Sequence, residues 1–456
     1  MATEGVKAAA PAGPAGERAQ ARPAGRGVLG RVSWGLADQA VTSMINFAVG
    51  SYVARELGVH AFGVFSLAWL TYGVVLNVSR GLATDPLMVR FSGVPEGAWR
   101  AAAARSSGTA LAVGATLGAV CLLVGLGLGG DVGPAFASLG LALPALLLQD
   151  SRRFAFFAAG TGRKAFANDL VQGLALIPAM VLAARVGTVA AFLLAWGAAA
   201  AAAAGYGFLQ SGVRPRVTQA RGWLREQRDL GSRYLVENVS LSGAGQLRAY
   251  GLGAIVGVGA VGAVRGAELL QGPFLALLMG LSLVTVAEAA RVLRQTPQRL
   301  GRFCLLLGGG QAGAALLWGS ALLLMPDRAG QFVLGDVWHS ASQLIVPATL
   351  GVAGAGLGSG AAAGLRALAA ARRSLRCQLF GSACYLGGGL GGAAAAGTVG
   401  SAWGVATATA CGAAVWWLQL RAALREHHRT PSSDPSATPD PSATPDPSAT
   451  PEVRTP

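Results

Sequence analysis

Residues 235–273 decide the fold, and they read LVENVSLSGAGQLRAYGLGAIVGVGAVGAVRGAELLQGP. Most of this stretch is apolar enough to lie in a lipid bilayer. It also contains seven ionisable or amide side chains, which are Glu237, Asn238, Gln246, Arg248, Arg265, Glu268 and Gln271. Ionisable groups inside a membrane-spanning helix are costly, and they usually mark a transport pathway or an internal ion pair. The stretch therefore predicts two spanning helices that carry charge.

An earlier part of the chain resembles this stretch at an offset of 199 residues. Residues 36–43, LADQAVTS, fall on residues 235–242, LVENVSLS, so that an acid followed by an amide occurs in both. The same offset places Gly58, Val59, Ala61 and Gly63 on Gly257, Val258, Ala260 and Gly262. The repeat predicts two related halves.

The composition is that of a membrane protein. The 456 residues are 53% hydrophobic and only 12% charged, whereas soluble domains carry about 25% charged residues. Segments of about 20 apolar residues can cross the hydrocarbon core. We expect twelve such spans, at about residues 32–53, 62–83, 103–128, 134–157, 166–185, 188–210, 234–258, 262–288, 301–325, 342–365, 375–396 and 399–420.

The positions of the basic residues give an orientation. With twelve spans, 31 of the 36 Lys and Arg residues fall in the two tails and in the loops on the same side. Positive residues concentrate on the cytoplasmic side, so we expect a multi-pass protein of a bacterial plasma membrane with both termini in the cytoplasm. The net charge of +15 thus reflects topology and contact with membrane lipid, and it does not indicate a nucleic-acid partner.

Five regions follow from these spans. We expect a disordered tail at 1–30, a six-helix bundle at 31–212, a basic linker at 213–233, a second six-helix bundle at 234–422 and a disordered tail at 423–456 that repeats DPSATP. The linker contains Trp223 and Leu224, around which a short amphipathic surface helix fits the pattern. The apolar run after the first tail has no cleavage site, which favours a span over a signal peptide.

Signatures of enzymes and of metal sites are missing from the sequence. It contains no GxxxxGK[ST], GxSxG or HExxH motif, and its cysteines and histidines are not spaced as metal ligands. Two GxGxxG matches lie inside predicted spans, where glycines usually serve helix packing. We therefore expect a protein that is not an enzyme and that needs no cofactor or metal.

Several polar residues within the spans are candidates for a substrate cavity. Arg248 either holds an anionic substrate, forms a buried pair with a carboxylate from another helix, or extends to the membrane interface. Arg265 and Glu268 lie three residues apart and form either a local ion pair or a substrate contact. The remaining cavity candidates are the amides Gln39, Asn46, Asn238 and Gln271.

Two further groups of candidates lie toward the cytoplasmic side. The carboxylates Asp38 and Glu237 are candidates for coupling to protons or ions, although an interfacial position explains Asp38 equally well. Arg80, Asp150 and Arg153 are candidates at the cytoplasmic face, where headgroup contact is the simpler interpretation. Asp150 and Arg153 have the spacing of an i,i+3 ion pair.

Four segments resemble a known family. GLADQAVTSMINFAVGSYVARELGVHAFGVFSL at 35–67, TDPLMVR at 84–90, LLQDSRRFAFFAAGTGRKAFANDL at 147–170 and VGAVRGAELLQGP at 261–273 resemble the polysaccharide-unit flippases. These flippases belong to the multidrug/oligosaccharidyl-lipid/polysaccharide (MOP) exporter superfamily. The resemblance implies an all-α membrane protein whose two six-helix bundles form a V, related by an axis along the membrane normal.

The resemblance also implies a function. It predicts alternating-access translocation of a lipid-linked oligosaccharide, in which arginines hold an isoprenoid (pyro)phosphate and amides bond to the sugar. Glycosyltransferases or a polymerase of the same pathway are then expected partners. A multidrug or cation antiporter of the same superfamily is the main alternative. A glycan polymerase or ligase is disfavoured because the predicted spans leave no large external loop, and the charges within the spans disfavour a non-transporting scaffold.

Overall fold

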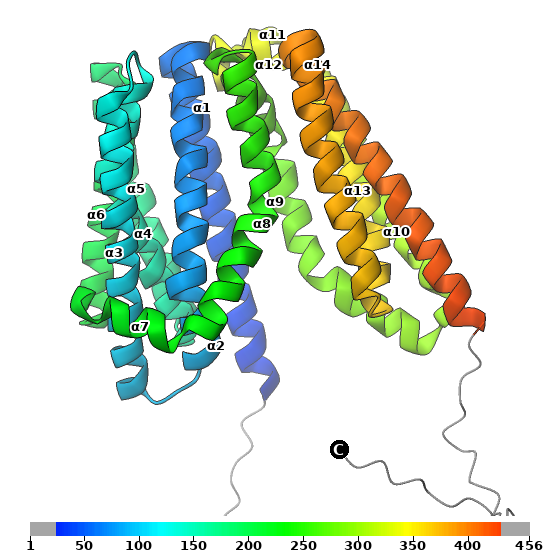
Figure 1. Cartoon of the computed structure of the whole chain (residues 1–456), viewed down its shortest axis with the longest axis horizontal. Helices are drawn as coiled ribbons and strands as arrows, with labels where there is room; N and C mark the ends of the chain where they lie inside the picture. The colour runs from blue at the N-terminus through cyan, green and yellow to red at the C-terminus, as the bar shows by residue number, and fades with distance from the viewer. Residues whose placement is uncertain (1–23, 430–456) are drawn as a thin grey trace, which may run out of the picture.

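The structure is a computed structural model that describes residues 24–429, apart from the side chains of 24–40, 240–242, 276–284, 286–287 and 428–429. The described chain forms two groups of helices that meet at one end and diverge toward the other, as Figure 1 shows. The first group contains α1 (Ala24–Ser79), η1 (Arg80–Thr84), α2 (Asp85–Phe91), α3 (Glu96–Gly127), α4 (Val132–Ala158), α5 (Gly162–Val186) and α6 (Val189–Ser211).

The linker and the second group complete the described chain. The linker forms η2 (Val217–Gln219) and α7 (Ala220–Glu226), the short helix expected around Trp223. The second group contains α8 (Arg228–Ile255), α9 (Val258–Gln295), η3 (Pro297–Arg299), α10 (Leu300–Leu323), α11 (Asp327–Leu334), α12 (Val337–Ser342), α13 (Ile345–Ala367) and α14 (Ala371–Arg429).

Two of the long helices, α1 and α14, contain a kink at which the helix axis changes direction. The backbone of α1 leaves the helical conformation at Gly58, with φ of 71°, and that of α14 does so at Ala396 and Gly397. Positive φ is readily adopted only by glycine, which explains the glycines at Gly58 and at Gly397, where φ is 61°. Counted as separate legs, these two helices and the eight other helices of 23 residues or more give twelve legs, and their positions agree with the twelve predicted spans.

By length and composition alone, seven of the described helices are long and apolar enough to cross a membrane. This number is lower than twelve partly because α1 is counted once, together with η1 and α2. Polar residues in α8 and the many glycines in α14 also reduce the hydropathy of those two helices. The all-α membrane fold expected from the sequence is confirmed.

The two groups cross at paired glycines. A Cβ atom on Gly63 of α1 would lie 2.1 Å from the carbonyl oxygen of Val258, and one on Gly262 of α9 would lie 2.3 Å from that of Val59. These four residues are the ones matched by the repeat. In each group the matching glycine packs against the matching carbonyl of the other group, as expected for two halves related by a two-fold axis.

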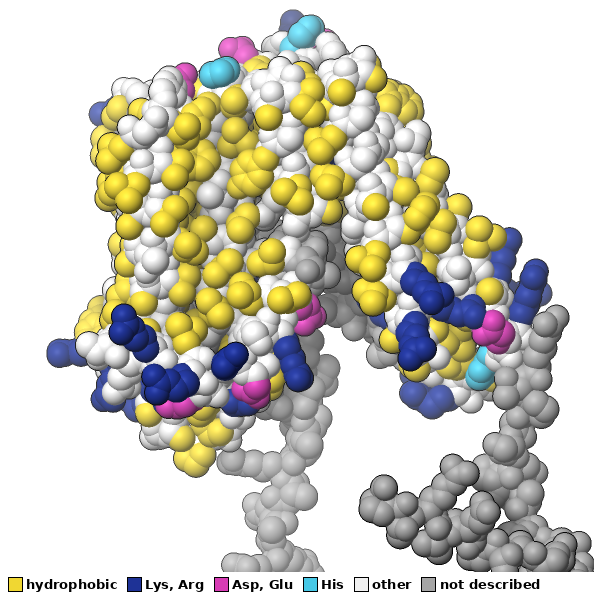
Figure 2. Space-filling model, in the orientation of Figure 1, with side chains coloured by type: hydrophobic (Ala, Val, Ile, Leu, Met, Phe, Trp, Pro, Cys, Tyr) yellow, Lys and Arg dark blue, Asp and Glu magenta, His cyan; other side chains and the backbone are white. Residues whose placement is uncertain are grey.

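Lys and Arg side chains gather at the end where the groups diverge, as Figure 2 shows. We call this the basic end. The short helices α11 and α12 lie at the opposite end, where the groups meet (Figure 1). There the Arg55 guanidinium lies 5.0 Å from the ring centroid of Phe332, so that the second group also covers the end of the first α1 leg.

At three places the helix bounds differ from the predicted limits of the tails and the linker. Helix α1 begins at Ala24, α8 begins at Arg228 and α14 continues to Arg429, so helices extend into the regions expected to be the tails and the linker. At the end of α14 the reason is visible. Leu420 and Ala423 are buried, and Glu426 forms an ion pair with Arg373 at the start of the same helix.

Candidate functional site

A cavity of about 210 Å³ lies where the two groups face each other. Leu70 of α1 contributes from the first group, and α8, α9 and α14 contribute from the second. Its polar lining consists of Gln246, Arg248, Arg265, Glu268 and Tyr385. The cavity therefore combines most of the charge that the sequence placed in the seventh and eighth spans.

Glu268 joins the two arginines of the cavity. Its Oε1 accepts a hydrogen bond from Arg248 Nη2 at 3.0 Å, and its Oε2 accepts one from Arg265 Nη1 at 3.2 Å. The Arg248 guanidinium also lies 5.2 Å from the ring centroid of Tyr385, a cation–π contact. Two cations share one carboxylate, so the cluster has a surplus positive charge and can attract an anion.

Arg248 is the least solvated of the three charged residues. It is only 5% exposed, and within the described residues its buried Nε has no hydrogen-bond partner. A buried donor without a partner is costly. Gly389 of α14 makes room for the side chain, because a Cβ there would lie 2.7 Å from Arg248 Cδ. Helix α14 thus leaves space for the Arg248 side chain, although not every hydrogen-bond donor of that side chain has a partner among the described residues.

The other cavity candidates lie elsewhere. Gln271 is buried and donates from Nε2 to Thr349 Oγ1 at 3.0 Å, which joins α9 to α13. Asn238 donates from Nδ2 to Asp85 Oδ2 at 2.7 Å, a bond between the two groups near the basic end. Asn46 is exposed outside the cavity lining.

The two coupling candidates are not part of the cavity lining. Glu237 is exposed on α8. The side chains of Asp38 and Gln39 lie outside the described residues, although their backbone belongs to α1.

The three candidates predicted for the cytoplasmic face belong to a separate cluster of ion pairs in the first group. Arg80 makes two hydrogen bonds to Asp150, from Nη2 at 2.7 Å and from Nε at 3.1 Å. Arg153 Nε lies 3.0 Å from Asp169 Oδ2. The sequence suggested an Asp150–Arg153 pair, but each takes a partner from another element, because helix packing brings η1 and α5 against α4.

Amides and hydroxyls complete this cluster. Asp169 also accepts hydrogen bonds from Thr42 Oγ1 at 3.0 Å and from Gln149 Nε2 at 2.9 Å. The Arg80 guanidinium lies 4.9 Å from the ring centroid of Phe154. Each guanidinium here is matched by its own carboxylate, so the cluster is suited to holding helices together more than to holding a ligand.

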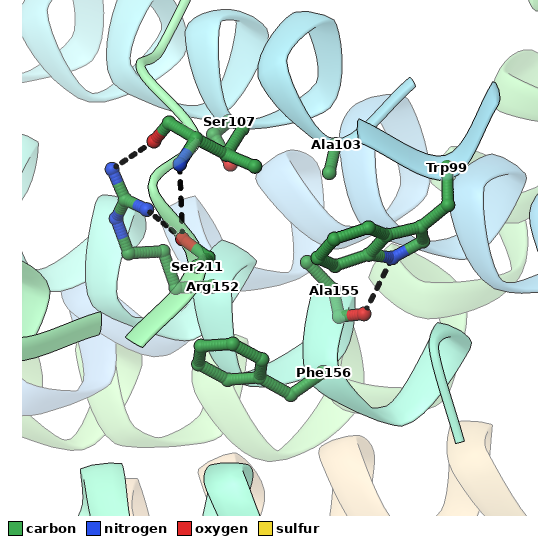
Figure 3. A pocket seen from close by; sticks show the side chains of 8 residues that line it. Trp99, Ala103, Ser107, Arg152, Ala155, Phe156 and Ser211 are labelled. Atoms are coloured by element: carbon green, nitrogen blue, oxygen red, sulfur yellow. Dashed lines mark hydrogen bonds between the residues drawn. The ribbon is translucent and has the colours of Figure 1, made fainter. Parts of the chain in front are cut away.

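A third arginine of the first group has no acidic partner in its pocket, which Figure 3 shows from close by. Arg152 donates from Nη1 to Ser211 Oγ at 3.4 Å and from Nη2 to the carbonyl of Val213 at 3.1 Å. The adjoining cavity, lined also by Trp99 and Phe156, has a volume of about 10 Å³. That is about the space of one water molecule, so this pocket is too small for a substrate.

The sequence did not single out Tyr385 and Leu70 as lining residues. Tyr385 is the one tyrosine in a span otherwise rich in glycine and alanine, and this contrast was an available sign. Leu70 carries no such sign, because its place in the cavity depends on how the first group faces the second.

No protein-family model matches the sequence, and no curated protein matches it. Solved structures do match. The structure is similar to an inward-facing multidrug resistance MATE family transporter of the MOP superfamily, with a TM-score of 0.69, 15% identity and coverage of 86% of this chain and 96% of that one.

Two further solved structures are similar. An outward-facing MATE family transporter gives a TM-score of 0.53 at 13% identity, covering 89% of this chain and 96% of that one. The lipid II flippase MurJ, in an inward closed conformation, gives 0.64 at 9% identity, covering 86% of this chain and 87% of that one. The chain therefore has the two-bundle fold of the MOP superfamily exporters.

Proposed function

We propose that this protein is an alternating-access flippase that translocates a lipid-linked oligosaccharide or polysaccharide precursor across the plasma membrane. The observation that carries the proposal is the cavity between the groups, in which Arg248 and Arg265 share the single carboxylate of Glu268. A diphosphate carries the opposite charge, and its oxygens suit the planar donors of arginine. Among the described residues the Nε of Arg248 has no hydrogen-bond partner, so the guanidinium is not fully satisfied without a ligand.

The shape supports an inward-facing state. The groups meet at the end with α11 and α12 and diverge at the basic end (Figures 1 and 2). The similarity is also higher to the inward-facing transporter, at 0.69, than to the outward-facing one, at 0.53. The enrichment of Lys and Arg favours a cytoplasmic basic end, and both termini then lie in the cytoplasm.

Coupling to an ion or proton gradient belongs to the same proposal. Glu237 and Asp38 occupy matching positions of the two halves, on the first helices of the two groups. The hydrogen bond between Asn238 and Asp85 is beside Glu237 and connects the groups near the basic end. A change of protonation at these carboxylates would alter the contact that must break when the groups rock. Glycosyltransferases or a polymerase would supply or consume the substrate.

A multidrug or cation antiporter is the second candidate. The similarity to a multidrug resistance transporter favours it, and Glu268 offers a carboxylate to a cationic ligand. The two candidates differ in which charge of the cavity is needed. A flippase for a phosphate-linked lipid requires the arginines, whereas a cation antiporter requires Glu268.

Binding by the purified full chain separates the two candidates. We expect a polyprenyl diphosphate to bind and the lipophilic cation ethidium not to bind. Arg248→Ala should weaken diphosphate binding by about tenfold or more, because truncating one partner of a desolvated charge contact costs roughly 2 kcal/mol or more. Glu268 keeps Arg265 as a partner in this variant, so the fold should persist.

Arg185→Ala is the matched control. Arg185 is exposed at the end of α5, so this substitution removes the same charge at a position away from the cavity. Glu268→Gln should retain or increase diphosphate binding, since it raises the positive charge of the cavity. Binding of ethidium that is lost in Glu268→Gln and kept in Arg248→Ala would replace the flippase proposal with the antiporter.

A further inference from the structure

A larger cavity, of about 410 Å³, lies within the second group and away from the site between the halves. It is bounded by α10, α13 and α14. Its apolar wall includes Leu305, Leu357, Leu420 and Leu424, and two arginines, Arg302 and Arg421, also line it. We call it the α10–α14 groove. No residue of the first group lines it, so it is not part of the proposed translocation pathway.

The groove runs from the interior of the second group of helices to its outer surface. Leu420 is fully buried, whereas Leu305 is 55% exposed. Gly301, at the start of α10, leaves the groove open, because a Cβ there would have only Leu424 Cδ1 within 4 Å, at 3.4 Å. In a membrane-spanning bundle, an apolar groove that opens sideways faces the acyl chains of the bilayer.

The two arginines of the groove are available to a ligand. Both are exposed, and among the described residues neither Arg302 nor Arg421 has an ion-pair or hydrogen-bond partner. Neighbouring Arg373, in contrast, is held by Glu426. No acidic side chain of the described residues lines the groove, so the charge of its described lining is positive.

The arginines also lie at a defined depth. Arg302 is in the first turn of α10, and Arg421 is in the last part of α14, so both are near the basic end. Arginine side chains near helix ends reach the headgroup level while their aliphatic stems stay in the apolar region. Basic pockets between spanning helices on this side of a membrane suit anionic headgroups. Guanidinium groups that can donate hydrogen bonds to a phosphate, next to an apolar wall, match the headgroup and the acyl chains of a phospholipid.

We propose that the α10–α14 groove binds one anionic phospholipid of the leaflet at the basic end. The lipid phosphate lies between the guanidinium groups of Arg302 and Arg421, and one acyl chain lies along the leucines. This site depends on the membrane location of the chain but not on what the chain transports. A bound lipid there would fill the groove of the second group as the groups move against each other.

Native mass spectrometry of the full chain tests the site, with phosphatidylglycerol as the anionic probe and phosphatidylcholine as the zwitterionic one. We expect one phosphatidylglycerol to stay bound and phosphatidylcholine to be lost. The double variant Arg302→Gln/Arg421→Gln should bind phosphatidylglycerol roughly 30-fold more weakly, from about 1 kcal/mol for each charge. Gly301→Leu keeps both charges, fills the groove and should also lose the lipid.

The double variant Arg372→Gln/Arg376→Gln is the matched control. Both residues are exposed near the basic end on α14, outside the groove lining, and their loss changes the net charge equally. It should bind the lipid as the unaltered chain does. Equal binding by all variants, or an unaffected Gly301→Leu, would overturn the proposal. Displacement of phosphatidylglycerol from the groove by a polyprenyl phosphate would also overturn it, because the groove would then belong to the transported lipid.

Discussion

The two halves share backbone features but differ in the side chains that line them. Gly58 and Gly257 both have positive φ, 71° and 111°, where one helical leg gives way to the next. Gly63 and Gly262 make the same close approach to the opposite half. At the offset of 199 residues, however, the positions of Arg248, Arg265 and Glu268 are occupied in the first half by Val49, Ser66 and Trp69.

The consequence is a filled interior in the first half, whereas the second half supplies the charged lining of the cavity between the halves. Trp69 stacks on Trp196 at 4.5 Å between ring centroids, and Tyr72 meets Trp196 edge-on at 4.6 Å. In the first half, Arg80 and Arg153 are matched by the buried carboxylates of Asp150 and Asp169. The comparison indicates that shared backbone features govern how the halves meet, whereas the divergent side chains give the second half the charged lining of the cavity, which we propose as the binding side, with the first half as its support.

The largest effect should come from the buried charges of the first half. Asp150→Asn leaves Arg80 without its carboxylate in a site where the Asp150 side chain is only 6% exposed. Breaking such a pair should cost about 3 kcal/mol of unfolding free energy. Glu268→Gln in the second half should cost about 1 kcal/mol, because Glu268 is 42% exposed and solvent screens its pairs.

Thermal and denaturant unfolding of the purified variants measure both costs. Asp131→Asn is the control, because Asp131 is exposed at the end opposite the basic end and its one ion-pair contact among the described residues, to His60, is 3.7 Å long. Equal losses for Asp150→Asn and Glu268→Gln would contradict the division into a supporting half and a binding half.

The next largest effect should come from the glycines at which α1 and α9 cross. This effect also tests whether a two-fold axis relates the halves. Gly63→Ala and Gly262→Ala each place a methyl group against a carbonyl oxygen of the other half. Each should cost about 2 kcal/mol, since overpacked contacts cost roughly 1–3 kcal/mol. Each should also move the two halves apart where α1 and α9 cross. Crosslinking between cysteines introduced in α1 and α9 can measure this separation.

The two substitutions should have equal effects if the crossing is symmetric. Gly309→Ala in α10 is the control, because a Cβ there meets no atom within 4 Å and alanine favours the helix. A damaging Gly63→Ala beside a silent Gly262→Ala would show that the halves are not equivalent at the crossing.

The sequence predicted those features that depend on local pattern. Apolar length predicted the twelve legs. The repeat paired Gly58 with Gly257, and both have positive φ where one leg ends and the next begins. The Arg265–Glu268 contact was also predictable, because residues three apart share a helix face. These features need no knowledge of which helix lies next to which.

Partners across helices were not predictable in the same way. Arg248 and Glu268 are 20 residues apart, and Arg80 and Asp150 are 70 apart. An i,i+3 spacing suggested Arg153 for Asp150, but Arg80 of η1 makes two hydrogen bonds to it instead. Asn46 was grouped with the cavity on polarity alone, although it is exposed outside the lining. Tertiary packing decides such choices, and a single sequence contains little information about it.

The linker adds a last asymmetry, because it docks on the first half. Trp223 is buried there and donates from Nε1 to the carbonyl of Leu82 at 3.1 Å. Arg105 Nη2 lies 2.7 Å from Glu226 Oε1 at the end of α7, and this hydrogen bond holds the pKa of the Glu226 carboxyl below its ordinary value. A lowered folded-state pKa gives stability that is present above the unfolded pKa and is lost as the pH falls through the folded one.

Glu226→Gln should therefore have the smallest effect, a slightly lower Tm at neutral pH and a shallower loss of Tm on acidification. Comparing Tm at about pH 7 and about pH 3 measures both. Glu56→Gln, at the exposed end of the first α1 leg, is the control and should leave the difference unchanged. An unchanged acid dependence in Glu226→Gln would mean that the other contacts of the linker with the first half, which include the buried Trp223 and the ion pair between Arg90 and Asp229, hold it without the Arg105 pair.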